Sequence, residues 1–422
     1  MQEKTDNLEN PPEVAAEVPA EFSSLGLDAR LLEALEEKGY RVPTPIQVQA
    51  IPHALAGQDV LGCAQTGTGK TAAFVLPMLQ LLSARPAGDH RIRGLILTPT
   101  RELADQVEGA VAAYGARLSI EPLVVYGGVS IAAQIKDLKF GCDVLVATPG
   151  RLLDHLGRGT VSLSSVEMLV LDEADRMLDM GFIDDVRKIV RATPRERQTM
   201  LFSATIPNAI HSLAHEMMRD PVSVQAGPQT RAEGITEVVH PVDYANKHGL
   251  VLHVLEQAEG QALVFTRMRS TAAYLTKYLA SRGLSVDDLH GDKTQAERTR
   301  SLEAFRAEET RVLVATNVAA RGLDIVGITH VINFDVPDDP NDYLHRVGRT
   351  ARHDQTGDAI TLLSPHEWIH LRQIEALMGY PIPRAVVEGY EPSVEPPKSA
   401  LAAKAAEDAQ PRSRLNRGRR SR

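Results

Sequence analysis

A glycine-rich stretch from Ala64 to Thr71 constrains this chain more than any other feature of its sequence. It follows the short apolar run 59–63 and precedes a segment with helical character. Strand, glycine loop and helix in this order are typical of a P-loop, in which backbone N–H groups surround phosphate oxygens. Lys70 would face the β- and γ-phosphates, and the Thr71 hydroxyl would hold Mg²⁺. Because Ala64 replaces the usual first glycine, a plain βα turn with a surface lysine is the alternative. The residues expected to surround the phosphates are Ala64, Gln65, Thr66, Gly67, Thr68, Gly69, Lys70 and Thr71.

Length and composition set the class of protein. The 422 residues are enough for two or three domains, and 43% hydrophobic with 24% charged residues is typical of a globular protein. No apolar run approaches the ~20 residues that cross a bilayer, and the chain does not start with a basic flank and an apolar stretch. Two cysteines, Cys63 and Cys142, are too few for a disulfide framework. We therefore expect a cytoplasmic protein with reduced cysteines and no membrane contact.

Charge is unevenly distributed along the chain. The net charge of −9 argues against a globally basic face for nucleic acid. Residues 1–21 hold six acidic residues and one lysine and are predicted to be disordered, whereas residues 411–422 hold six arginines and no acidic residue. This tail is predicted either to tether structured RNA through its phosphates or to be merely solvated. A nucleic-acid site in the core must be a local groove.

Short apolar runs alternate with helix-like segments through most of the chain. Strands without polar alternation, separated by helices, indicate a parallel sheet covered on both faces. Residues 144–148 recur identically as 312–316, and the same offset of 168 residues relates 95–98 to the similar 263–266. Two matches at one offset predict two copies of one α/β fold. The second copy lacks a Gly-Lys-Thr loop, so we expect it to complete the site of the first.

The domain boundary is predicted where hydrophobicity falls and glycine and proline appear, near residues 225–234. The expected parts are a disordered acidic extension (1–21), a first domain (22–225), a linker (226–235), a second domain (236–380), and a connector with the Arg-rich tail (381–422).

Asp172 and Glu173 come directly after the apolar strand 168–171. Ligands bind at the carboxyl ends of strands in open α/β sheets. An acid at the position of Asp172 would hold Mg²⁺, partly through water, and Glu173 would orient or deprotonate a water behind the γ-phosphate. The alternative is an acidic helix N-terminus favoured by the helix dipole. The P-loop makes the catalytic interpretation the stronger one.

Asp172-Glu173-Ala174-Asp175, with Ala64–Thr71 before it and Ser203-Ala204-Thr205 after it, resembles the DEAD-box family of superfamily 2 RNA helicases. The resemblance runs from Phe22 to about Leu363, and residues 176–182 are most similar to the bacterial RhlE-like group. It implies two tandem RecA-like domains, each a parallel sheet flanked by helices. It also implies an RNA-stimulated ATPase that binds single-stranded RNA and locally separates short duplexes, with opening and closure of the two domains coupled to hydrolysis.

The resemblance also implies roles at the ATP site. Gln47, in a segment similar to the family's Q motif, would bind the adenine edge with its carboxamide, and Phe22 would lie against the base. Asp324 would contact the nucleotide from the second half. The implied catalytic residues are Lys70, Asp172 and Glu173, with Arg349 and Arg352 as arginine fingers. The implied cofactors are ATP and Mg²⁺, with Thr71 and Asp172 on the metal.

RNA contacts are implied for loops that follow strands in both halves. Small residues, helix N-termini and arginines suit backbone phosphates and do not distinguish bases, while 2′-OH groups would distinguish RNA from DNA. The implied RNA-binding residues are Pro99, Thr100, Arg101, Gly128, Thr148, Pro149, Gly150 and Arg151 in the first half, and Gly291, Gln295, Arg298 and Thr316 in the second. Coupling between the ATP and RNA sites is implied for Asp175, Ser203, Thr205, Asn317, His345 and Arg346.

Two positions depart from the family pattern, and three functions stay open. Asn317 stands where the family most often has Asp, and Ala351 replaces the more usual glycine. Beside the helicase, the alternatives are an ATP-gated RNA clamp or assembly factor, and a DNA-directed motor that the Gln47 and 172–175 signatures disfavour. A ribonucleoprotein or RNA-decay complex is an expected but unidentified partner.

Overall fold

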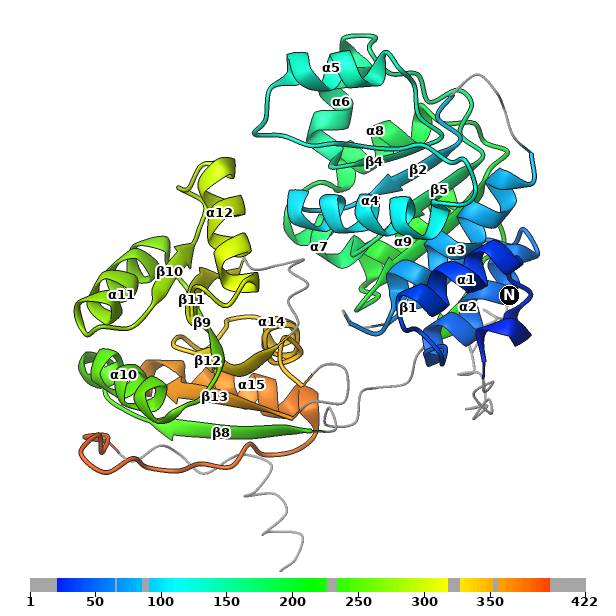
Figure 1. Ribbon diagram of the computed structural model, residues 1–422. Coiled ribbons are helices and arrows are strands. Elements are labelled where there is room, and N and C mark those ends of the chain that lie inside the picture. Colours follow the sequence, from blue (N-terminus) through cyan, green and yellow to red (C-terminus); the bar gives the residue numbers. More distant parts are fainter. Residues whose placement is uncertain are drawn as a thin grey trace, which may run out of the picture.

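The structure is a computed structural model that describes residues 21–64, 67–85, 91–225, 234–317, 327–351 and 356–394. Within these ranges the chain forms two α/β domains, each built on one parallel sheet flanked by helices (Figure 1). The predicted fold class is therefore confirmed for the two domains. Residues 1–20 of the acidic extension, most of the linker and the chain from 395 onward lie outside the described ranges. The domain boundaries given above stay predictions.

The first sheet has seven strands in the order β3-β4-β2-β5-β6-β1-β7. All of its pairings are parallel, which requires a crossover between successive strands. The strands are β1 (Val60–Cys63), β2 (Gly94–Leu97), β3 (Pro122–Val125), β4 (Val144–Ala147), β5 (Met168–Leu171), β6 (Gln198–Ser203) and β7 (Val222–Gln225).

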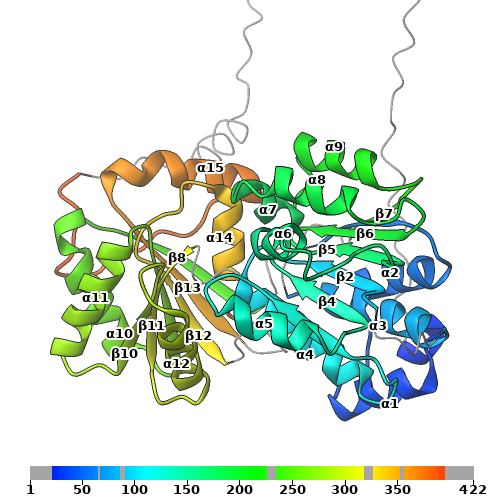
Figure 2. The same ribbon diagram turned by 90° about the horizontal axis from the view of Figure 1, so that it is seen from above.

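Helices cover both faces of this sheet and enclose two apolar cores (Figure 2). Side chains alternate along each strand, so that Ile96 packs with α1–α4 whereas Leu95 and Leu97 pack with α6–α9. The helical elements are η1 (Phe22–Leu25), α1 (Ala29–Glu37), α2 (Pro45–Leu55), α3 (Lys70–Ser83), α4 (Arg101–Gly115), α5 (Ile131–Leu138), α6 (Pro149–Gly157), α7 (Ala174–Asp179), α8 (Ile183–Arg191) and α9 (Asn208–Met217).

The second sheet repeats the strand order of the first. Its order β10-β11-β9-β12-β13-β8 matches that of the first sheet strand for strand, apart from the additional edge strand β7. The identical pentapeptides lie in the equivalent strands β4 and β11, which confirms the predicted repeat. The strands are β8 (Ile235–Pro241), β9 (Gln261–Thr266), β10 (Val286–Leu289), β11 (Val312–Thr316), β12 (Ile328–Asn333) and β13 (Gly357–Leu363). The helices are η2 (Tyr244–Asn246), α10 (Lys247–Gln257), α11 (Arg269–Ser281), α12 (Gln295–Arg306), α14 (Pro340–Val347), η3 (Pro365–Glu367) and α15 (Trp368–Met378).

The segment that we predicted as a connector after residue 380 packs along β8. Val239 N–H donates to the Pro383 carbonyl at 2.8 Å, and Ala385 N–H donates to the Val239 carbonyl at 3.0 Å. Ile382 is buried, and Ser393 bonds to Asp243. As far as Ser393, this segment therefore covers the outer edge of the second sheet.

A buried ion pair joins three parts of the second domain. Lys247 Nζ lies 2.6 Å from Glu367 Oε2 and 2.6 Å from the Phe334 carbonyl oxygen. Glu367 Oε1 also accepts the Val336 N–H at 3.0 Å. Although burial opposes it, the Lys247 ammonium and hydrogen bonds from Ser364 lower the pKa of Glu367. The pair therefore links the start of α10 and the end of η3 to the residues that directly follow β12. Among the helices of the described ranges, none is long and apolar enough to cross a membrane.

Candidate functional site

The phosphate loop begins where β1 ends beside β6. Ala64 N–H donates to the Ser203 carbonyl at 2.9 Å, which fixes the start of the loop to the sheet. Gly67 and Gly69 have φ of 89° and 84°, in the left-handed region that favours glycine. A Cβ on Gly69 would overlap the Gln47 amide nitrogen. The backbone therefore favours glycine at both positions; Gln65 and Thr66 lie outside the described residues.

Lys70 is the first residue of α3 and is only 5% exposed. Its Nζ is buried and has no hydrogen-bond partner among the residues that the structure describes. An ammonium group without a partner is costly to bury, and it lies at a helix N-terminus that itself favours anions. Thr71 follows it in the same turn. This orphaned cation and the glycine backbone fit a polyphosphate.

Asp172 lies at the carboxyl end of β5 and is buried. Burial raises the pKa of its carboxyl group to about 6, against the opposing effect of the Lys70 ammonium. The Glu173 N–H donates to Asp172 Oδ1 at 2.9 Å. A bound divalent cation would supply positive charge that favours the ionised form, and hydroxyl and carboxylate oxygens are the donors that Mg²⁺ prefers. Thr71 and Asp172 therefore fit Mg²⁺ as a donor set.

Glu173 is held in an unusual conformation next to Asp172. Its φ and ψ are 53° and 52°, a left-handed geometry that strains residues other than glycine. Its Oε2 accepts a 2.7 Å bond from Arg176 Nη1, and both side chains are buried. Arg176 was not among the predicted site residues. The sequence carries no signal for this pair, because Glu173 precedes α7 in a left-handed conformation and does not lie one helical turn from Arg176.

The predicted coupling residues of the first domain do meet one another. Asp175 N–H donates to Ser203 Oγ at 3.0 Å. Asp175 Oδ2 accepts from the Thr205 N–H at 3.0 Å and from its hydroxyl at 3.1 Å. The end of the acidic motif and the segment after β6 are therefore locked together.

Gln47 connects the N-terminus of α2 to the phosphate loop. Its Oε1 accepts the Thr44 N–H at 2.8 Å, and its Nε2 donates to the Gly69 carbonyl at 3.0 Å. Phe22 is 5% exposed and packs in the core of the first domain. The contacts of Gln47 and Phe22 with adenine stay predictions, as does that of Asp324, which lies outside the described residues.

The predicted RNA-binding residues of the first domain lie around helix N-termini. The Thr100 side chain caps α4, and Thr148 is the N-cap residue of α6 without a side-chain cap, so the first N–H groups of both helices lie at the same edge of the sheet. The Arg101 guanidinium lies where a Cβ of Gly128 would be, and Gly128 has a φ of 83°. Arg151 Nη1 donates to Gln134 Oε1 at 2.7 Å. Pro99 directly precedes Thr100, and Pro149 and Gly150 follow Thr148 as the first residues of α6.

Residues of the second domain join this group directly. Arg298 Nε donates to Glu102 Oε1 at 2.9 Å, and Arg101 Nη1 donates to Gln295 Oε1 at 3.1 Å. Burial lowers the pKa of Arg101, and the neighbouring Arg298 and Arg151 cations lower it further. The structure therefore brings together predicted residues from sequence positions nearly 200 apart. The pairing of Glu102 with Arg298 was not predicted, because nothing in the sequence indicates it.

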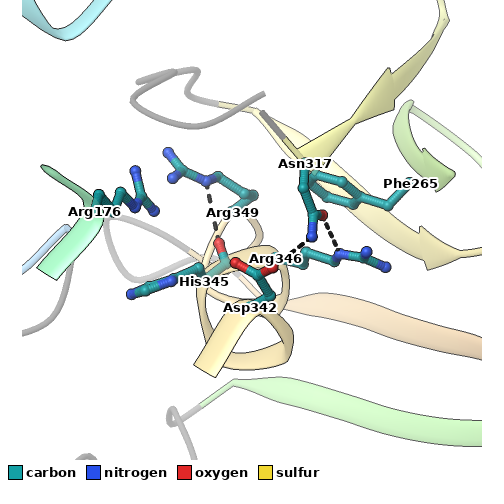
Figure 3. A pocket seen from close by; sticks show the side chains of 7 residues that line it. All are labelled: Arg176, Phe265, Asn317, Asp342, His345, Arg346 and Arg349. Atoms are coloured by element: carbon teal, nitrogen blue, oxygen red, sulfur yellow. Dashed lines mark hydrogen bonds between the residues drawn. The ribbon is translucent and has the colours of Figure 1, made fainter. Parts of the chain in front are cut away.

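A small pocket between the domains holds the remaining candidates (Figure 3). Arg176 reaches it from the first domain, and Arg349 faces it from the second, 3% exposed, with its Nε donating to the His345 carbonyl at 3.2 Å. The other lining residues are Phe265, Asn317, Asp342, His345 and Arg346. Arg352 lies outside the described residues, while Ala351 has a φ of 52°. Gly291 and Thr316 precede and follow α12 in the chain, on the loop after β10 and at the end of β11.

Comparison with known proteins gives matches over most of the chain. Residues 44–213 match the DEAD/DEAH box helicase family, and residues 246–354 match the helicase conserved C-terminal domain. The ATP-dependent RNA helicase CshA of Limosilactobacillus reuteri is 44% identical over 359 residues, covering 84% of this chain and 71% of the relative. Saccharomyces cerevisiae Dbp5 bound to RNA and ADP BeF3 is 31% identical with a TM-score of 0.80, covering 87% of this chain and 96% of that one.

The same yeast protein in another complex is less similar in structure. A Dbp5 variant bound to Nup159, Gle1, IP6 and ADP has a TM-score of 0.62 at 29% identity, covering 91% of this chain and 100% of that one. Of these two Dbp5 structures, the complex with RNA is therefore the more similar to this chain. The RhlE-like subgroup stays a prediction. The two family models, the identity to CshA and the paired α/β domains together show that this chain belongs to the DEAD-box family of ATP-dependent RNA helicases.

Proposed function

We propose that this helicase hydrolyses ATP at a site shared by its two domains, and that RNA binding assembles that site. The observation that carries the proposal is the pocket in which Arg176 of the first domain and Arg349 of the second face the same space (Figure 3). The phosphate loop and the acidic motif belong to the first domain alone, so Arg349 is supplied only when the domains are together.

The first domain would bind ATP and hold the attacking water. Lys70 would receive the β- and γ-phosphates, since its buried ammonium has no partner among the described residues. Thr71 and Asp172 would hold Mg²⁺, which supplies charge neutralisation at the phosphates when bound. Glu173 would orient the water or accept its proton, with Arg176 fixing its carboxylate. Arg349, and Arg352 three residues further along the chain, would stabilise negative charge on the γ-phosphate as the bond breaks.

RNA would bind at the edge where α4, α6 and α12 begin. Arg101, Arg151 and Arg298 and the helix N-termini offer charge and N–H donors to phosphates. None of these groups is arranged as a reader of base edges, so we infer little sequence preference, with RNA distinguished from DNA by its 2′-OH groups. Of the remaining predicted RNA contacts, Gly291 follows β10 and Thr316 ends β11, at the carboxyl ends of strands in the second sheet.

Coupling follows from the division of both sites between two domains. Each ligand contacts both halves and therefore favours closure, so ATP and RNA should strengthen each other's binding. The Asp175, Ser203 and Thr205 network would transmit closure within the first domain. An RNA strand held between the closed domains would have a shape that no longer fits a duplex. Closure would therefore separate short duplexes locally. We expect this to take place in the cytoplasm, in an unidentified ribonucleoprotein or RNA-decay complex.

An Arg349→Ala variant tests the shared site. We expect RNA-stimulated hydrolysis to fall ~10³-fold, as when an arginine finger is removed. Arg306→Ala is the matched control, because Arg306 is exposed at the end of α12 remote from Gln295. Steady-state phosphate release with saturating single-stranded RNA gives the rates. Unchanged RNA-stimulated hydrolysis in Arg349→Ala would refute a site completed by the second domain.

A further inference from the structure

Gln134 is buried on α5 and bonds to Arg151, a predicted RNA contact on α6. Its Oε1 accepts a 2.7 Å hydrogen bond from Arg151 Nη1, and its Nε2 donates to the Tyr126 carbonyl oxygen at 3.1 Å. A guanidinium can only donate and a carbonyl oxygen can only accept. These two partners therefore fix the orientation of the Gln134 carboxamide, with its oxygen toward Arg151.

His155 lies one helical turn after Arg151 on α6 and bonds to the same carboxamide oxygen. Its side chain is fully buried, and its Nε2 lies 3.1 Å from Gln134 Oε1. Because this oxygen can only accept, Nε2 must carry a proton. Burial lowers the pKa of His155, and the Arg151 cation lowers it further. Both effects favour a neutral ring, whose single proton is then on Nε2.

Thr160 provides the hydrogen bond on the other side of the ring. Its Oγ1 lies 2.9 Å from His155 Nδ1. In the neutral tautomer Nδ1 is an acceptor, so the Thr160 hydroxyl donates to it. The His155 carbonyl oxygen, 3.1 Å from the same hydroxyl, already accepts the Thr160 N–H at 3.0 Å. Thr160 therefore favours the tautomer that donates to Gln134.

Arg151 is held at two of its nitrogen atoms. Nη1 bonds to Gln134, and Nη2 donates to the Val129 carbonyl oxygen at 3.0 Å. A guanidinium carries five N–H donors, so these two bonds leave others for a phosphate. An arginine that is already held loses less side-chain entropy when its ligand binds. The contacts from Thr160 through His155 to Gln134 therefore preorganise a predicted phosphate contact.

We propose that His155 is a positioning residue for RNA binding: its Nε2–H holds the Gln134 carboxamide, which in turn holds Arg151 in the orientation that meets a phosphate. The inference rests on the proposed function, because it takes the phosphate contact of Arg151 from there. His155 is fully buried, so it acts on RNA only through Gln134 and Arg151.

Two substitutions of the buried ring test this role. His155→Leu fills the core but cannot donate to Gln134, and single-stranded RNA should bind about three- to fivefold more weakly, the effect of one hydrogen bond. His155→Gln places an amide N–H near the position of Nε2 and should bind RNA within about twofold of the parent. Fluorescence anisotropy of labelled single-stranded RNA with the full chain, over a range of salt concentrations, gives the affinities.

Salt dependence separates a positioning role from a loss of structure. Each phosphate contact on a single strand contributes about 0.7 to the slope of log affinity against log salt. Arg151→Ala should reduce the slope by about 0.7, and His155→Leu should reduce it by a large part of that amount. Partial unfolding would lower the fraction of protein that binds RNA but would leave the slope unchanged.

Double variants and a matched control give the second comparison. In an Arg151→Ala background, His155→Leu should have no further effect on RNA affinity, because its route to RNA is already removed. Gln134→Leu interrupts the same contacts from α5 and should weaken RNA binding at least as much as His155→Leu. The control is His53→Leu, because His53 also bonds to a glutamine, Gln58, at 2.8 Å but lies on α2. It should keep the parental affinity and slope.

The outcomes separate this inference from the proposed function. If His155→Leu keeps the parental slope, or if its loss of affinity multiplies with that of Arg151→Ala, His155 does not act through Arg151. Should His155→Leu fail to fold, Gln134→Leu is compared with Arg151→Ala in the same way. If Arg151→Ala itself keeps the parental affinity and slope, the phosphate contact is wrong and the inference fails with it. The proposed function fails separately, if RNA does not stimulate ATP hydrolysis by the parent protein.

Discussion

Ala351 offers a test of backbone strain next to the arginines of the second domain. Its φ of 52° lies in the left-handed region, where an alanine pays roughly 1–2 kcal/mol relative to glycine. Glycine loses more conformational entropy than alanine on folding, and this loss offsets about 0.4–1 kcal/mol of the strain that is relieved. Ala351→Gly should therefore raise the free energy of unfolding by roughly 0.8 kcal/mol, between limits of about 0 and 1.6 kcal/mol.

A matched substitution in the same domain should have the opposite effect. Ala273 is half-buried in the interior of α11, where glycine in place of alanine costs about 1 kcal/mol. Trp368 is the only tryptophan of the sequence. It packs, as Ala351 does, against the core that includes Val347 and Leu371. Urea unfolding followed by tryptophan fluorescence therefore reports on the domain that carries both substitutions. A lower free energy of unfolding in Ala351→Gly would refute the strain argument.

Three further predictions concern other parts of the molecule. Glu367→Gln should lower the free energy of unfolding at pH 7 by about 3 kcal/mol, since it leaves the buried Lys247 without its counter-ion. Because the pKa of Glu367 is lowered, its contribution is present above the usual glutamate pKa and lost on acidification, so urea unfolding should show less acid sensitivity in the variant. Lys70→Ala should abolish phosphate release but leave RNA binding without ATP intact, as measured by fluorescence anisotropy. Removal of residues 411–422, with their six arginines, should weaken RNA binding and reduce the slope of log affinity against log salt; equal slopes would mean that the tail does not contact phosphates.

The sequence predicted the parts of the fold that depend on local pattern. Buried parallel strands read as continuous apolar runs, so β2, β4, β5 and β9 were found and the repeat was recognised. Strand β10 was missed because it carries Asp287 and Asp288, whose charges are offset by Lys293 from the next loop. Edge strands such as β7 are short and half exposed and have a weak pattern of their own.

At the candidate site, residue types could be predicted but their partners could not. The loop glycines and the acids after β5 follow from chain order, because strand ends meet at one edge of a sheet. The Arg176 to Glu173 pair and the contacts of Asn317 depend on side-chain directions within one domain, and the Glu102 to Arg298 pair depends on the approach of the two domains. The left-handed backbone of Glu173 has no signal in the sequence, because glutamate rarely adopts it.

The most direct test of the account is ATP hydrolysis by the full chain without nucleic acid, with single-stranded RNA, and with single-stranded DNA of the same sequence. A site that RNA assembles from two domains predicts a low basal rate, strong stimulation by RNA and little by DNA. Equal rates in all three conditions would contradict the account, because Arg349 would then reach the ATP site without any help from RNA.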